Sequence, residues 1–184
     1  MSHAIGIIEL SSIAAGYQAQ DAMLKAADVA PLVARTICSG KFLIIIGGTV
    51  SAVGAALGAG EADAAGFLIE SLNIPNVDPQ VFTAISGNVD LTGRDHRSLG
   101  IVETFSATPI IEAADAAVKA ADVVLLRVHV SMAIGGKGFM LVNGDTAAVN
   151  AAVEAACDIV GDSGMLVNRV VIPSASPELL KEYI

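Results

Sequence analysis

The stretch Gly6–Val29, GIIELSSIAAGYQAQDAMLKAADV, occurs a second time in the chain as Gly100–Val123, GIVETFSATPIIEAADAAVKAADV. The two stretches align without a gap, begin with Gly-Ile-x-Glu and end with Lys-Ala-Ala-Asp-Val. Self-similarity of this kind indicates a duplicated structural unit. We therefore divide the chain into two copies of one domain, residues 1–86 and 98–184, joined by a polar, turn-rich linker at 87–97.

The repeat continues beyond these stretches, after small insertions. Ser39-Gly40-Lys41 matches Gly135-Gly136-Lys137, GGTVSAVGAAL matches NGDTAAVNAAV, and NIPNVDP matches VIPSASP. Each copy predicts the order β-α-β-β-α-β, which gives an α+β fold of two sheets with packed helices, and a short helix is expected after Pro79 and after Pro177. In the first copy we expect strands and helices at about 3–9, 12–27, 30–37, 41–46, 50–65 and 67–74.

Composition limits the possible partners and compartments. Asp and Glu total 19 against 10 Lys and Arg, a net charge of −9, and no basic run is present, which argues against a nucleic-acid partner. Cys38 and Cys157 lie far apart and form neither a disulfide framework nor a paired metal motif. The N-terminus lacks the pattern of a secretory signal, so we expect a reducing cytoplasm.

Two other readings of the segment from Phe42 to Gly60 are excluded by the second copy. The segment has no charge and could pass for a membrane helix, but its counterpart carries Asp145 and Glu154, which hydrocarbon would penalise. A Gly-Gly turn between strand and helix also suggests a phosphate loop, yet neither GxGxxG nor GxxxxGK[ST] is present. We expect a buried strand, a turn and an Ala-rich helix capped by Thr49.

The sequence gives little support to an enzyme. No Ser/His/Asp set or carboxylate pair recurs in both copies, and an active site between the copies would need a polar cluster that the sequence does not show. Glu9 and Glu103 do recur, and we expect them to favour the N-terminus of the following helix. Cys157 has the spacing of a core residue, and on the residues alone Cys38 is also better explained as a buried, inert cysteine.

The repeated Gly-Ile-x-Glu opening, the Lys-Ala-Ala-Asp-Val ending, the following Gly-bearing loop and GDTAAVNAAV together resemble the bacterial microcompartment shell domain. The resemblance covers nearly all of both copies and implies an antiparallel sheet in each. A tandem pair is similar to the trimeric shell proteins, in which three chains form a pseudo-hexameric plate around a central pore. TICSGKF with RVHVSMAIGGKGFMLVNGD is similar to the propanediol-utilisation type, which carries an iron–sulfur cluster.

The resemblance also implies a site, a location and partners. The loop between the second and third strands would line the axis, so that Cys38 occurs three times around one point and three thiolates bind a [4Fe–4S] cluster whose fourth ligand is not a cysteine. Small residues beside it would let the backbone approach the axis. The protein would be a structural homotrimer in the microcompartment shell of the bacterial cytoplasm, contacting other shell proteins and a redox enzyme in the lumen. The implied pore loops comprise Cys38, Ser39 and Gly40 in copy one and Ile134, Gly135 and Gly136 in copy two.

Three points remain open at this stage. A shell trimer whose pore passes small metabolites without a cofactor is the alternative function. Lys25 and Lys119 would lie at the rim of the plate and contact neighbouring plates, or they would simply stabilise the ends of their helices. Where the resemblance leads us to expect proline after the cysteine, this chain has Ser39.

Overall fold

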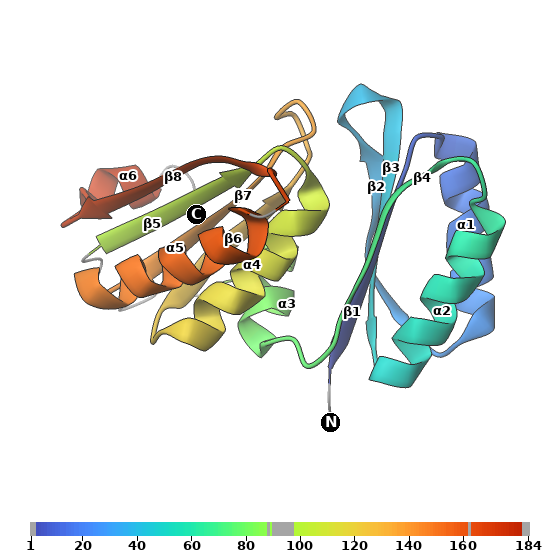
Figure 1. Ribbon diagram of the computed structural model, residues 1–184, viewed down its shortest axis with the longest axis horizontal. Coiled ribbons are helices and arrows are strands. Elements are labelled where there is room, and N and C mark those ends of the chain that lie inside the picture. The colour runs from blue at the N-terminus through green and yellow to red at the C-terminus, as the bar shows by residue number, and fades with distance from the viewer. Residues whose placement is uncertain (1–2, 88, 90–97, 162, 182–184) are drawn as a thin grey trace. The chain divides into compact units, whose positions relative to one another are not determined.

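A computed structural model of the chain describes residues 3–87, 89, 98–161 and 163–181 (Figure 1). The chain divides into two compact units, Met1–Val77 and Asp78–Ile184, which we call unit 1 and unit 2. Most of the expected linker at 87–97 lies outside the described residues. Unit 2 also includes α3, the short helix that follows the first copy of the repeat.

Unit 1 is a four-stranded sheet with two helices packed on it. Both helices begin where the sequence predicts, because the hydroxyls of Ser12 and Thr49 accept hydrogen bonds from the first-turn N–H groups of Ala15 and Ala52. The elements in chain order are β1 (Ala4–Leu10), α1 (Ile13–Ala26), β2 (Ala30–Ile37), the 3-10 turn η1 (Cys38–Gly40), β3 (Lys41–Gly48), α2 (Val50–Asp63) and β4 (Leu68–Ile74).

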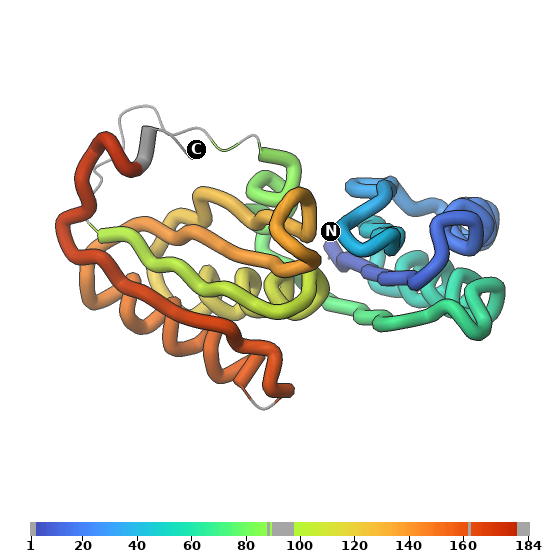
Figure 2. Tube along the Cα trace, turned by 90° about the horizontal axis from the view of Figure 1, so that it is seen from above, coloured from blue at the N-terminus to red at the C-terminus, as the bar shows by residue number. Residues whose placement is uncertain are grey.

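Unit 2 repeats this arrangement and adds a short helix at each end. Helices α4 and α5 pack against each other and against the strands of their sheet (Figure 2). The elements in chain order are α3 (Pro79–Ser86), β5 (Ser98–Thr104), α4 (Ala107–Ala120), β6 (Val124–Val130), β7 (Gly138–Gly144), α5 (Thr146–Gly161), β8 (Leu166–Pro173) and α6 (Pro177–Lys181).

The two sheets have the same topology and register. Their strand orders are β2-β3-β1-β4 and β6-β7-β5-β8, and every neighbouring pair is antiparallel. Gly6 lies opposite Ile46 in unit 1, as Gly100 lies opposite Val142 in unit 2. Irregularities in the pairing also recur, because each of the two edge strands of each sheet carries one extra residue relative to its neighbour. The predicted order of elements and the predicted antiparallel sheets are therefore confirmed.

Small residues set how closely the helices approach the sheets. A Cβ added at Gly6 would lie 2.8 Å from Val53 Cγ1, and one at Gly100 would lie 2.7 Å from Val153 Cγ2. Only glycine lets the helix on each sheet pack this closely, since real Cβ atoms do not approach within 3 Å. The glycine of the repeated Gly-Ile-x-Glu opening is therefore a packing residue.

The uncharged segment from Phe42 to Gly60 forms a strand, a turn and a helix. Its strand part belongs to β3, a buried central strand of the sheet of unit 1, and its helix part belongs to α2. Among the described residues, no helix is long and apolar enough to cross a membrane.

Candidate functional site

Cys38 lies in the tight turn that joins β2 to β3. The turn contains Cys38, Ser39 and Gly40, and the Cys38 side chain is partly exposed. Ser39 has φ 66° and Gly40 has φ 71°, so two consecutive residues adopt the left-handed conformation. A proline could not replace Ser39 in this turn, because its ring fixes φ at about −65°. The departure from the expected proline therefore fits the geometry of the loop.

The matching loop of unit 2 ends with the same backbone conformation. Gly135 has φ 69° and Gly136 has φ 89°, in the positions of Ser39 and Gly40. Lys137 then directly precedes β7, whereas its counterpart Lys41 is the first residue of β3. Ile134 consequently occupies the position of Cys38, so each chain supplies one thiol to this pair of loops.

The loop of unit 2 is longer, and its own hydrogen bonds close it. Ser131, which is fully buried, donates from Oγ to the Gly136 carbonyl oxygen at 2.8 Å, and its N–H donates to the Lys137 carbonyl oxygen at 3.0 Å. Residues 131–136 thus form a bridged turn. Its first half contains further left-handed residues, Ser131 and Ala133.

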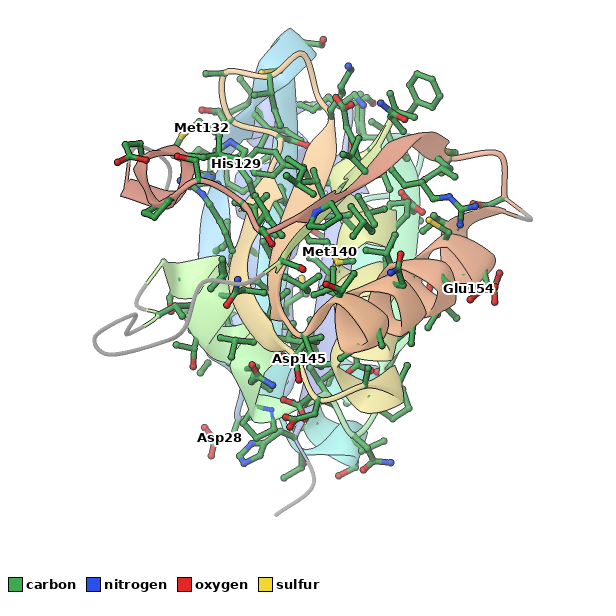
Figure 3. The ribbon with its side chains drawn as sticks, turned by 90° about the vertical axis from the view of Figure 1, so that its left-hand side faces the viewer. Asp28, His129, Met132, Met140, Asp145 and Glu154 are labelled. Carbon is green, nitrogen blue, oxygen red and sulfur yellow. The ribbon has the colours of Figure 1, made fainter. Side chains whose placement is uncertain are left out.

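His129 supports the start of this longer loop. His129 and Met132 lie close together (Figure 3), with His129 Nε2 2.8 Å from the Met132 carbonyl oxygen. The Nδ1 atom of His129 lies 3.3 Å from Arg127 Nη2, and its ring stacks on that of Phe139 with the ring centroids 5.1 Å apart. A tautomer with Nε2–H donating to the carbonyl and Nδ1 accepting from the guanidinium satisfies both contacts. The imidazole ring therefore connects strand β6 to the first residues of the loop.

An ion pair that the sequence analysis missed anchors both loops at their ends. Lys41 Nζ lies 2.7 Å from Glu9 Oε1, and Lys137 Nζ lies 2.8 Å from Glu103 Oε1. We expected the two glutamates to favour the N-termini of the following helices. Instead α1 is capped by Ser12, and each carboxylate accepts a hydrogen bond from the lysine that follows the loop. The signal was present in the sequence, because Gly-Ile-x-Glu and the lysine after the loop recur together.

Lys25 and Lys119 lie in the last turns of α1 and α4, where they also suit the negative end of the helix dipole. Each forms an ion pair with the aspartate one turn earlier, Asp21 or Asp115, at 2.5 Å. The Lys25 side chain is 75% exposed and that of Lys119 is 46% exposed. Both ammonium groups are therefore accessible at the surface of this chain.

Cys157 is a core residue of unit 2, as its spacing predicted. It lies buried on α5, and burial raises the pKa of its thiol, an effect that a hydrogen bond from Arg169 only partly offsets. Beside it, between α5 and β8, lies a cleft of about 380 Å³ whose polar lining is Asn150, Glu154 and Arg169. A protonated, buried thiol is a poor nucleophile and a poor metal ligand.

The described part of one chain does not by itself form a metal site. Within the described residues, no group of three or more His, Cys, Asp or Glu side chains is placed to hold a metal ion. The Cys38 thiol is the soft type of ligand that iron–sulfur clusters use, and its turn consists otherwise of small residues. The Cβ position of Gly40 has no atom within 4 Å, so the turn leaves open space beside the cysteine. The residues fit a cluster only when several copies each contribute this thiol.

Comparison with known proteins agrees with the duplicated fold. The family model of the BMC domain matches residues 4–77 and again 98–175. The bacterial microcompartment shell protein PduT of Citrobacter freundii is 49% identical over 185 residues, which is 100% of this chain and 99% of PduT. The carboxysome shell protein CsoS1A of Hydrogenovibrio crunogenus is 44% identical over 86 residues, which is 44% of this chain and 85% of CsoS1A.

Solved structures show the same likeness. A crystal structure of a microcompartment protein from Desulfitobacterium hafniense has a TM-score of 0.92 at 44% identity, covering 97% of this chain and 98% of that one. The fused permuted hexameric shell protein of the RMM microcompartment has a TM-score of 0.64 at 25% identity, covering 87% and 82% of the two chains. With two domain matches and a full-length relative, the chain belongs to the BMC-domain family of bacterial microcompartment shell proteins.

Proposed function

We propose that three copies of this chain form a pseudo-hexameric shell plate whose central pore binds one [4Fe–4S] cluster through the three Cys38 thiolates. The observation that supports this most directly is the position of Cys38, at the turn between β2 and β3, where the second copy has Ile134. Three-fold symmetry would convert one thiol per chain into three thiolates at one point. A [4Fe–4S] cluster takes about four ligands, so the fourth would be solvent or a small molecule.

The turn suits the close approach that this proposal needs. Ser39 and Gly40 are small, and their left-handed backbone is held between two regular strands. Backbone N–H groups of such a turn can donate to cluster sulfides and tune the reduction potential. The ion pair between Lys41 and Glu9 fixes the end of the turn at the start of β3, which limits how far the thiol can move.

The cluster would supply one-electron redox chemistry when bound. The plate would then relay electrons, or deliver the cluster, across the shell between the cytoplasm and a redox enzyme in the lumen. Neighbouring shell proteins would pack around the plate, with Lys25 and Lys119 at its rim, and both lysines are exposed in this chain. The fold gives the protein a structural role, and no enzymatic step is part of the proposal.

Replacing the thiol tests the proposal directly. Purified or reconstituted without oxygen, the wild-type protein should be brown and contain iron and acid-labile sulfide. The Cys38→Ser variant should be colourless while remaining a trimer by light scattering. Cys157→Ser is the matched control and should keep its iron, because Cys157 is buried in the core of unit 2. Loss of iron from both variants alike, or a wild type that binds none, contradicts the proposal.

The second candidate function is a pore that passes small metabolites without a cofactor. It is supported by the open space around the loop glycines, since Cβ atoms added at Gly40, Gly135 or Gly136 would meet no atom within 4 Å. A colourless wild-type trimer that lets small solutes through equally well with or without Cys38 would favour it.

A further inference from the structure

The cleft between α5 and β8 of unit 2 plays no part in the proposed cluster site. Its volume of about 380 Å³ falls within the range of about 300–1,000 Å³ that is usual for small-molecule sites. The residues that line it are the polar Asn150, Glu154 and Arg169 and the apolar Val153, Val170 and Val171. All of them belong to unit 2, so the cleft is formed within one chain.

The helix wall of the cleft offers two hydrogen-bond acceptors. Asn150 and Glu154 lie one turn apart on the exposed side of α5, and Val153 between them is buried. Glu154 projects from α5 (Figure 3), and among the described residues no hydrogen bond or ion pair occupies its carboxylate. Asn150 donates from Nδ2 to the Thr146 carbonyl oxygen at 2.8 Å, which leaves its Oδ1 to accept from a ligand.

The strand wall brings an arginine to the same cleft. Arg169 lies opposite Val102 of β5, and Val171 lies opposite Gly100. A Cβ added at Gly100 would lie 2.7 Å from Val153 Cγ2, so this face of the sheet is the one that α5 covers. Because alternate residues of a strand share a face, Arg169 and Val171 both lie on the side of α5.

The guanidinium of Arg169 has N–H groups left for a ligand. It donates a hydrogen bond to the buried Cys157 thiol, which uses only part of its donors. At these two positions unit 1 has Ser71 and Glu61, and there the serine hydroxyl donates to the carboxylate at 2.5 Å. The polar pair of unit 1 thus satisfies itself, whereas the arginine of unit 2 can hold a further acceptor.

The three polar residues of the cleft belong to the second copy of the repeat only. At the matching positions unit 1 has Gly54, Gly58 and Ser71. A Cβ added at Gly58 would meet no atom within 4 Å, so the first copy leaves open space where unit 2 has a carboxylate. Since both units have the same fold, the fold itself does not require these polar side chains.

We infer that this cleft binds a small zwitterion, namely an amino acid with an apolar side chain. The carboxylate of the ligand accepts from Arg169, and its ammonium group donates to Glu154 and to Asn150 Oδ1. Its side chain lies against Val153 and Val170, of which Val170 is 42% exposed. A ligand with one charge of each sign matches both charges of the cleft. A simple anion would leave Glu154 unpaired, and a neutral polyol would neutralise neither charge.

Ligand-observed NMR of the purified full-length protein tests this site, with L-leucine as the probe. Isocaproate is L-leucine without its ammonium group, and isoamylamine is L-leucine without its carboxylate. L-leucine should bind in the millimolar range. Each of the other two should bind at least about tenfold more weakly, because each loses one set of charge-assisted hydrogen bonds.

Two variants assign the charges of the ligand to the walls of the cleft. Arg169→Ser introduces the residue of unit 1 and should weaken L-leucine at least about tenfold while leaving isoamylamine unchanged. Glu154→Gln should weaken L-leucine in the same way and leave isocaproate unchanged. Asp63→Asn, at an exposed position on α2 of unit 1, is the control and should change none of the three.

Three results would overturn the inference. They are a wild type that does not bind L-leucine, binding of isocaproate or glycerol as tight as that of L-leucine, and a cleft variant that binds L-leucine as the wild type does. The iron content of the same samples separates this site from the cluster, because Arg169→Ser should leave it unchanged.

Discussion

At residue 16 the first copy has room for no side chain, because Phe42 fills the space. A Cβ added at Gly16 would lie 2.3 Å from Phe42 Cγ. In the second copy the large and the small residue change places, because Ile110 stands at the position of Gly16 and Gly138 at the position of Phe42. A Cβ added at Gly138 would lie 2.6 Å from Ile110 Cγ2. The space between helix and strand is thus filled by a strand residue, Phe42, in the first copy and by a helix residue, Ile110, in the second copy.

This exchange predicts a compensating pair of substitutions. Gly16→Ile should lower the free energy of unfolding by about 1–3 kcal/mol or more, because overpacking a filled core forces neighbours to shift. The double variant Gly16→Ile with Phe42→Gly copies unit 2 and should recover more than half of that loss in urea unfolding at fixed protein concentration. Gly58→Ala, at an exposed helix position with no atom within 4 Å, is the control and should be neutral or stabilising. Equal losses for the single and double variants would contradict the interpretation.

At the scale of elements, the sequence predicted the strands and helices well because each depends on local signals. The predicted strand at 30–37 has those bounds, and the caps Ser12 and Thr49 were readable from the residue types that accept first-turn N–H bonds. Contacts between residues of different elements were less predictable from the sequence. The carboxylate of Glu9 and the ammonium of Lys41 come together only through the pairing of β1 with β3, and a prediction of separate elements does not contain that pairing.

The two copies of this ion pair predict unequal effects on stability. The Glu9 side chain is 1% exposed, whereas that of Glu103 is 34% exposed. Lys41→Met removes a partner from a buried carboxylate and should lower the free energy of unfolding by roughly 2–4 kcal/mol. Lys137→Met removes a partner from a solvated carboxylate and should cost under about 1 kcal/mol. Equal effects of the two substitutions in urea unfolding would show that burial of Glu9 does not set the strength of the anchor.

At the scale of the whole molecule, most of what could be predicted from the sequence followed from the duplication. The repeat identified two domains. It also argued against a membrane helix and a phosphate loop, since a structure predicted for one copy had to be compatible with the sequence of the other. The position of α3 was not predictable in this way. Its sequence follows the first copy, yet Gln80 accepts a hydrogen bond from the N–H of Leu125 and the N–H of Asp78 donates to the Asp115 carboxylate, both in the second copy. The proposed site could not be predicted from ligand groupings either, because within the described residues no group of three or more His, Cys, Asp or Glu side chains is placed to hold a metal ion.

The central claim is that three chains share one cluster, and native mass spectrometry of the anaerobic protein tests it most directly. The account predicts a trimer whose mass exceeds that of three chains by one [4Fe–4S] unit, and a Cys38→Ser trimer without that addition. A wild-type trimer with the bare mass of three chains after anaerobic reconstitution, or iron bound by single chains, would contradict it.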